Sequence, residues 1–185
     1  VLSEFNGKAL FTNDIIKIEG IGNINDSTSD IKILVDKDDI LTATVEMEAK
    51  PSSLNFLGKY NFIQQGNSKL KILITKDINK KEWKANFDAN LFSNEVKIDF
   101  IKFFKPVNKR GSMVGTIYFD GINLTKVDQL DFITEDLLIS TRMLFKDQNK
   151  LESIFIDKFI KDKNNFKANV KFIENDYSLI NIEGE

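Results

Sequence analysis

The residues of this sequence that could do chemistry are carboxylates, lysines and hydroxyls, because the 185-residue chain contains neither histidine nor cysteine. This composition excludes serine–histidine and cysteine–histidine nucleophilic pairs, Cys/His zinc sites and haem ligation by histidine. A hydrolase that uses two carboxylates stays chemically open, but the spacing of the acidic residues nominates no pair. We therefore predict that the chain is not an enzyme and uses no cofactor and no metal.

The densest acidic group is the run "DKDD" at residues 36–39. Its carboxylates are suitable ligands for Ca²⁺, but the run lacks the glycine and the distal glutamate of an EF-hand loop. It also lies between two apolar stretches, which favours a solvated turn. The glycines at 20–22 and 111–115 do not have the spacing of a phosphate-binding loop.

The strongest basic group is "KFFKPVNKRG" (102–111), which places four cations beside two phenylalanines. Such a loop can meet phospholipid head groups or an anionic membrane surface; the alternative is a charged hairpin whose phenylalanines face inward. The cations in question are Lys102, Lys105, Lys109 and Arg110. The formal net charge of the whole chain is −2, and this lack of a basic excess predicts no nucleic-acid partner.

The remaining sequence consists largely of alternating apolar and polar residues, which is typical of strands with one buried face. In "ILTATVEMEA" (40–49), for example, the apolar residues occupy every second position. Comparable runs recur at 31–35, 70–74, 83–91, 96–100, 113–119, 137–145, 166–172 and 180–182. Short turn-rich connectors separate them, so we predict antiparallel neighbours rather than parallel strands, which need long crossovers.

Two segments depart from this rhythm. "PSSLNFLGKYNFIQQG" (51–66) has apolar residues at helical spacing and predicts one short helix near residues 52–60. "KLESIFIDKFI" (150–160) fits a helix or a strand, and its β-branched residues favour the strand. No linker interrupts the chain, so we expect residues 1–185 to form a single β-rich segment, excised from a longer chain.

The alternation does not tell what the apolar faces of the strands pack against. No run is apolar on both faces, which excludes a parallel sheet covered by helices on both sides. One possibility is a long antiparallel sheet, twisted and curved, whose apolar side forms a groove. The other is a closed β-sandwich or barrel, as in a structural or adhesion module with a conventional core.

Three stretches carry a resemblance to a known family. They are "SSLNFLGKYNFIQQGNSKLKI", "WKANFDANLFSNEVKIDFIKFFKPVNKRGSMVGTIYFDG" and the closing "YSLINIEGE". Their order of short helix, strands, lysine-containing loop and final strand with a Gly-acid step resembles the YhdP branch of the AsmA-like superfamily. Phe104 departs from the family pattern, which has a smaller or Trp-like residue before the lysine.

The resemblance implies a function as well as a fold. AsmA-like proteins are anchored in the inner membrane of Gram-negative bacteria, extend through the periplasm and carry phospholipid toward the outer membrane in an apolar β-groove. It implies phospholipid acyl chains as ligand, the inner membrane as a partner through a segment outside this chain, and an outer-membrane protein as a further candidate partner. The expected groove residues are Leu41, Val45, Met47, Leu70, Ile72, Ile74, Phe87, Ile98, Phe100, Ile117, Phe119, Ile139, Phe145 and Phe172.

Overall fold

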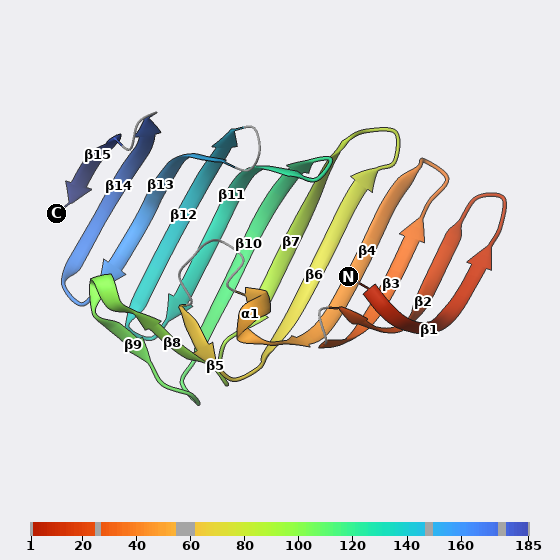
Figure 1. Cartoon of the computed structure of the whole chain (residues 1–185), viewed down its shortest axis with the longest axis horizontal. Coiled ribbons are helices and arrows are strands. Elements are labelled where there is room, and N and C mark those ends of the chain that lie inside the picture. Colours follow the sequence, from red (N-terminus) through yellow and green to blue (C-terminus); the bar gives the residue numbers. More distant parts are fainter. Residues whose placement is uncertain (1, 25–26, 55–61, 147–149, 174–176, 185) are drawn as a thin grey trace.

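The computed structural model describes residues 2–24, 27–54, 62–146, 150–173 and 177–184, and the structural statements below concern these residues. Most of them form one antiparallel sheet of twelve strands, arranged in space in the order in which they occur in the chain (Figure 1). The strands of this large sheet are β1 (Leu2–Phe11), β2 (Ile16–Ile24), β3 (Ser27–Val35), β4 (Ile40–Ala49), β6 (Ser68–Asp77), β7 (Glu82–Asn90), β10 (Gly111–Asp120), β11 (Asn123–Thr134), β12 (Leu137–Lys146), β13 (Lys150–Lys161), β14 (Asn164–Ile173) and β15 (Tyr177–Gly184).

The chain leaves this sheet twice, and the two excursions together build a second, smaller layer. After β4 it forms helix α1 (Pro51–Leu54) and strand β5 (Ile63–Gln65). After β7 it forms β8 (Glu95–Ile98), the 3₁₀ turn η1 (Asp99–Ile101) and β9 (Phe103–Lys105). The three short strands pair in the order β5-β8-β9 and lie across the lower part of the middle strands (Figure 1).

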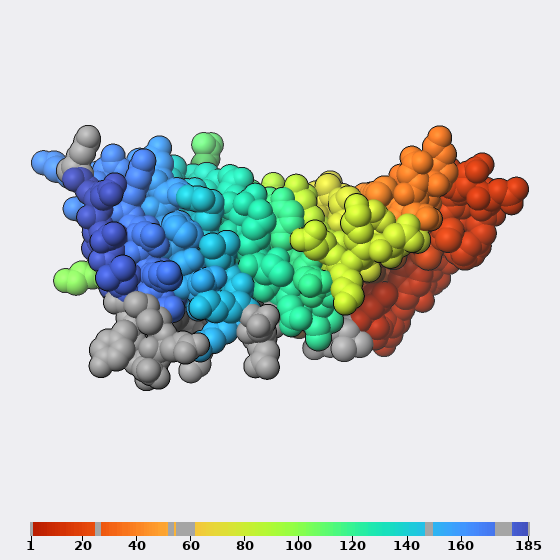
Figure 2. All heavy atoms as spheres, turned by 90° about the horizontal axis from the view of Figure 1, so that it is seen from above, coloured from red at the N-terminus to blue at the C-terminus, as the bar shows by residue number. Residues whose placement is uncertain are grey.

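The large sheet is open. β1 and β15 lie at its two ends and do not pair with each other. With strands spaced about 4.8 Å apart, a row of twelve is roughly 50 Å long. Seen from above, the molecule is correspondingly elongated, with the N-terminal and C-terminal strands at opposite ends (Figure 2). The prediction of a long antiparallel sheet is confirmed, and this sheet is not closed into a barrel.

The main core lies between the large sheet and the small one. We call the face of the large sheet that carries the small sheet the inner face, and the opposite one the outer face. Ala49 and Ala89 on the inner face are completely buried, as side chains this small let a second layer approach closely. From the small sheet, Val96, Ile98 and Phe103 join the same apolar cluster.

The structure assigns the two segments that depart from the alternating pattern, and the acidic run between β3 and β4. Residues 51–54 are helical, at the start of the predicted helix, while residues 55–60 of that prediction lie outside the described residues. Residues 150–161 form β13, so the prediction of a strand is confirmed. Residues 36–39 form an exposed turn between β3 and β4 in which the Asp36 carboxylate accepts hydrogen bonds from two backbone N–H groups.

The run 96–100 was expected to be one more strand of the alternating series, and this prediction was partly wrong. Residues 95–98 do form a strand, β8, but it pairs within the small sheet. Phe100 lies in the 3₁₀ turn η1 and is 76% exposed, so it contributes to neither face of the large sheet.

Candidate functional site: the apolar inner face

The inner face is apolar across the whole width of the large sheet. One row of directly paired residues takes a single apolar side chain from every strand, because each pair of neighbouring strands is in register at this level. From β1 to β15 this row runs Ala9, Ile18, Ile33, Ala43, Ile74, Ala85, Ile117, Val127, Met143, Ile154, Val170 and Ile180.

The next row, in the direction of the small sheet, contains a single polar side chain. It consists of Gly7, Gly20, Ile31, Val45, Ile72, Phe87, Gly115, Leu130, Thr141, Ile156, Ala168 and Ile182. The hydroxyl of Thr141 donates a hydrogen bond to the backbone carbonyl of Leu130, so it offers no charge or free donor to the face. These two rows therefore form a continuous apolar band across the inner face.

Only the middle of this surface is covered by the second layer. The buried apolar cluster and the side chains packed against it extend from β4 to Phe166 on β14. No inner-face side chain of β1, β2, β3 or β15 belongs to that cluster among the described residues. Exposure rises toward the C-terminal end, where Ile180 and Ile182 on β15 are 58% and 67% exposed; on the N-terminal side Ile31 on β3 is still buried, and Ile16 on β2 is 38% exposed.

Most of the predicted groove residues share this inner face. Leu41, Val45, Met47, Leu70, Ile72, Ile74, Phe87, Ile117, Phe119, Ile139, Phe145 and Phe172 all occupy inner-face positions of the large sheet. Ile98 belongs instead to the small sheet, where it is buried against the large one. Phe100 is the one member that the structure separates from the face entirely.

The alternating pattern of the sequence did not identify several inner-face residues, because backbone irregularities shift which residues of a strand face inward. In β11, register shifts place Val127 and Leu130 on the same face although they are three residues apart. In β13, similar shifts bring Ile154, Ile156 and Phe159 to the inner face. Each shift adds a residue to one strand of a pair, so simple period-2 counting fails beyond it.

At the N-terminal end the inner face is lined by glycine and covered by the chain itself. The first part of β1 curls across the front of the neighbouring strands (Figure 1), with Glu4 in a left-handed conformation at φ 52°. Phe5 then lies over a glycine pair: a Cβ atom added at Gly7 or Gly20 would come within 2.7 Å of its ring. An aromatic ring over a cross-strand glycine pair fills the gap that the missing side chains leave.

The basic loop does not present its four cations together. Lys105 is only 3% exposed, and its Nζ donates hydrogen bonds to the carbonyl oxygens of Asn94 at 2.7 Å and Pro106 at 3.2 Å. Burial lowers the pKa of this amine. The expectation that Lys105 meets a head group is therefore not compatible with its position, since the amine faces inward and joins β9 to the loop before β8.

The other three cations of that loop are exposed. Lys102 ends η1 in a left-handed conformation, and Lys109 lies 3.7 Å from the Glu135 carboxylate. Arg110 lines a shallow open depression together with Phe92 and Glu135. Phe103 points into the core whereas Phe104 is 55% exposed, so the loop contributes one phenylalanine to each side.

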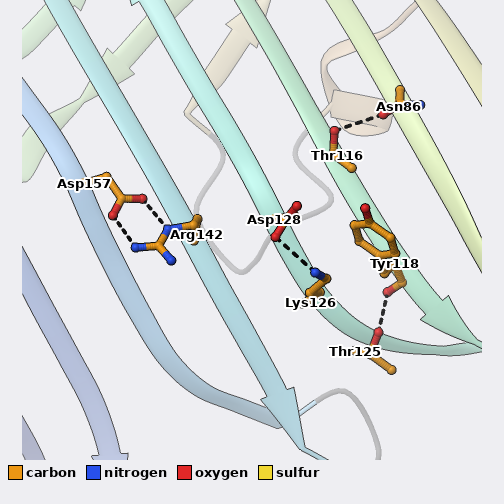
Figure 3. Close-up of polar contacts among 8 residues, drawn as sticks. All are labelled: Asn86, Thr116, Tyr118, Thr125, Lys126, Asp128, Arg142 and Asp157. Atoms are coloured by element: carbon orange, nitrogen blue, oxygen red, sulfur yellow. Dashed lines mark hydrogen bonds and ion pairs between the residues drawn. The ribbon is translucent and has the colours of Figure 1, made fainter.

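The outer face carries polar and charged side chains, and Figure 3 shows two of its ion pairs. Arg142 on β12 makes two hydrogen bonds to the Asp157 carboxylate on β13, and this ion pair lowers the pKa of Asp157. Lys126 contacts Asp128 at 3.1 Å and lies over the Tyr118 ring at 4.3 Å. This pattern is that of a solvated sheet face, with attraction between neighbouring strands.

The described residues contain no group of three or more acidic side chains placed to hold a metal ion. Among the same residues, no helix has the length and apolar character needed to cross a bilayer. In comparisons with known proteins, no family model, no curated protein and no solved structure matches this chain.

Proposed function

We propose that this chain is a lipid-sheltering segment of an AsmA-like protein of the YhdP branch. Such a protein is anchored in the inner membrane of a Gram-negative bacterium, and the segment would work in the periplasm, where phospholipid passes between the inner and outer membranes. The single observation that supports this proposal best is the unbroken apolar row across the twelve strands of an open sheet.

An open sheet with one apolar face exposes apolar surface to water unless another molecule covers that face. Exposed apolar surface of more than a few hundred Å² usually marks a site for a partner, a membrane or a ligand. An acyl chain placed on the inner face gains roughly 0.8 kcal/mol for each CH₂ group removed from water. An acyl chain makes no hydrogen bonds, so a surface of Ile, Val, Ala and Met side chains can bind it without any polar contact.

The best place for such a chain is the part of the inner face that the small sheet leaves free. On the C-terminal side this part is formed by Ile154, Val170, Ile180 and Ile182, all on β13 to β15. The polar outer face stays in water. The row of apolar residues continues beneath the small sheet, and a lipid would enter at the C-terminal end of the face, because Phe5 covers the glycine pair at the other end.

The test compares two neighbouring residues of β15 that are equally exposed but lie on opposite faces. Ile180 and Leu179 are each 58% exposed, the first on the inner and the second on the outer face. The chain and its Ile180→Asp and Leu179→Asp variants are purified under native conditions from a Gram-negative host. Native mass spectrometry then measures the phospholipid that each variant carries, and a fluorescent fatty acid gives its binding constant.

We expect the unmodified chain and the Leu179→Asp variant to carry phospholipid, and Ile180→Asp to lose at least half of it, because a carboxylate on the inner face must be desolvated by the acyl chain. Circular dichroism checks that all three proteins are folded. A folded, lipid-free protein that also ignores the fluorescent fatty acid would overturn the proposal, and so would equal losses in the two variants.

A further inference from the structure

The connection between β7 and β10 carries exposed apolar side chains that the inner face does not explain. This connection includes the small-sheet strands β8 and β9 and the turn η1 between them. Three of the five phenylalanines that are exposed in the described part of the chain lie on it, namely Phe92, Phe100 and Phe104. A group of exposed apolar side chains usually marks a contact with a partner or a membrane.

Two of these rings belong to one continuous group on the exposed side of the small sheet. Phe104 faces away from the large sheet, because Phe103 before it points into the core. Phe104 is directly paired with Lys97 on β8, whose backbone N–H donates a hydrogen bond to the Phe62 carbonyl at 2.8 Å. The Phe62 ring in turn meets that of Phe100 edge to face, at a centroid distance of 6.1 Å. We call Phe62, Lys97, Phe100 and Phe104 the aromatic patch.

Basic side chains are concentrated on the same connection. Residues 92–110 contain five lysines or arginines against two acidic residues, although the formal net charge of the whole chain is −2. Four of the five cations are exposed, the exception being the buried lysine of β9. Lys97 pairs with Asp99 at 3.0 Å, whereas Lys102 and Arg110 have no ion-pair partner among the described residues. The connection therefore presents local positive charge beside its exposed rings.

This combination fits the surface of an anionic bilayer better than it fits a folded protein partner. Aromatic rings are favoured at the level of the lipid head groups, and each lysine or arginine near an anionic leaflet adds attraction. A stable protein interface takes about 20–30 residues from each partner, and residues 92–110 have fewer exposed residues than this. A bilayer needs no complementary shape, so a short turn with two exposed rings is sufficient.

We propose that the connection between β7 and β10 docks on the surface of an anionic phospholipid bilayer. Phe100 and Phe104 enter the head-group region, and Lys97 and Lys102 lie against the lipid phosphates. The proposal goes beyond the sheltering of acyl chains and does not depend on it, because the aromatic patch lies on the side of the small sheet that faces away from the inner face.

The first test is flotation of the protein with vesicles. One set contains phosphatidylglycerol and phosphatidylethanolamine, and the other contains phosphatidylcholine alone. We expect the unmodified chain to float with the anionic set only, and to be released by salt, which screens exposed charges. Phe100→Ser/Phe104→Ser and Lys97→Gln/Lys102→Gln should each lower the partition onto anionic vesicles roughly tenfold, as two residues contribute to each effect.

The controls carry the same substitutions in the hairpin turns at the other end of the strands. They are Ile78→Ser/Ile122→Ser and Lys37→Gln/Lys81→Gln, all at exposed positions, and we expect them to float like the unmodified chain. The Ile180→Asp variant, which tests the inner face, should also float normally, so that a failure of lipid sheltering and a failure of docking are distinguishable. Circular dichroism checks that every variant is folded.

The absence of cysteine allows a second measurement with a fluorophore that responds to its surroundings. It is attached to Phe104→Cys in the aromatic patch or to Ile122→Cys in the turn between β10 and β11. We expect anionic vesicles to shift the emission to the blue for the label at 104 and to leave the label at 122 unchanged. No flotation with anionic vesicles, equal flotation of the patch variants and their controls, or equal shifts for the two labels would overturn the proposal.

Discussion

Replacing Phe103 by alanine tests whether the small sheet is packed on the large one as a true second layer. Phe103 is 5% exposed, and its ring meets that of Phe132 on β11 edge to face, at a centroid distance of 6.0 Å and an angle of 87°. A buried phenylalanine removes roughly 150–250 Å² from water. At about 25 cal/mol per Å² this corresponds to roughly 4–6 kcal/mol, an upper bound for the unfolded chain.

We therefore expect Phe103→Ala to lower the free energy of unfolding by about 3–5 kcal/mol, the usual range for a phenylalanine removed from a core. A double-mutant cycle with Phe132→Ala should give a coupling of about 0.5–1.5 kcal/mol for the aromatic pair. Both values follow from the contact between the two sheets, because Phe103 has no other role in β9 than to face Phe132 and its apolar neighbours.

The assay uses the single tryptophan of the chain. Trp83 on β7 stacks on Phe119 with a centroid distance of 4.0 Å, so its fluorescence reports the large sheet during urea unfolding. Phe104→Ala is the control, since Phe104 is the next residue on β9 and is 55% exposed on the other side; its effect should be within about 0.5 kcal/mol. Equal losses for the two variants would refute the two-layer arrangement.

Three further predictions concern the outer face, the N-terminal strands and the buried lysine. Asp157→Asn should cost only about 0.2–1 kcal/mol at neutral pH, as its ion pair with Arg142 is partly exposed. Because that pair lowers the pKa of Asp157, its contribution is present above the ordinary pKa of 3.8 and is lost as the pH falls through the lower value of the folded state. Urea titrations between neutral and acid pH should therefore show a smaller acid-induced loss in the variant, and an unchanged loss would contradict the assignment. Gly20→Ala should cost about 1–3 kcal/mol and raise amide exchange in β1, because its Cβ would lie 2.6 Å from the Gly7 Cα atom; a neutral effect would show that the strands are not this close. For Lys105, burial lowers the folded-state pKa below 10.5, so the unfolded state binds more protons between the two values and stability should rise with pH in that window. Lys105→Met should lack this rise in urea titrations at alkaline pH, and a rise of the same size in both proteins would assign it to other groups.

The strands could be predicted well wherever the alternation is undisturbed. In β4, apolar residues at 41, 43, 45, 47 and 49 face inward as the sequence indicates, because the register with β3 and β6 has no shift. In β13 the inner-face residues are Leu151, Ile154, Ile156 and Phe159, an irregular spacing that resembles a helix as much as a strand. The ambiguity of that segment thus has a physical cause: backbone irregularities change which residues face inward.

The candidate site was predicted in composition but not in extent. Alternation is a local property, so it identifies which residues share a face of one strand. It does not tell which strand pairs with which, and "EVKIDF" shows the consequence, because its alternation is the same whether it joins a large sheet or a small one. Lys105 shows a second limit, since a lysine between polar loop residues gives no local sign of burial.

By itself, the sequence determined that this protein is built from antiparallel strands, each with one apolar and one charged face, and that it lacks the residues for histidine or cysteine chemistry. Only the tertiary structure decided that twelve of these strands form one open row, and that the short strands beside Phe103 cover its middle but not its ends. The physical reason is that a strand's own pattern sets its faces, whereas pairing and closure depend on contacts between residues far apart in the chain.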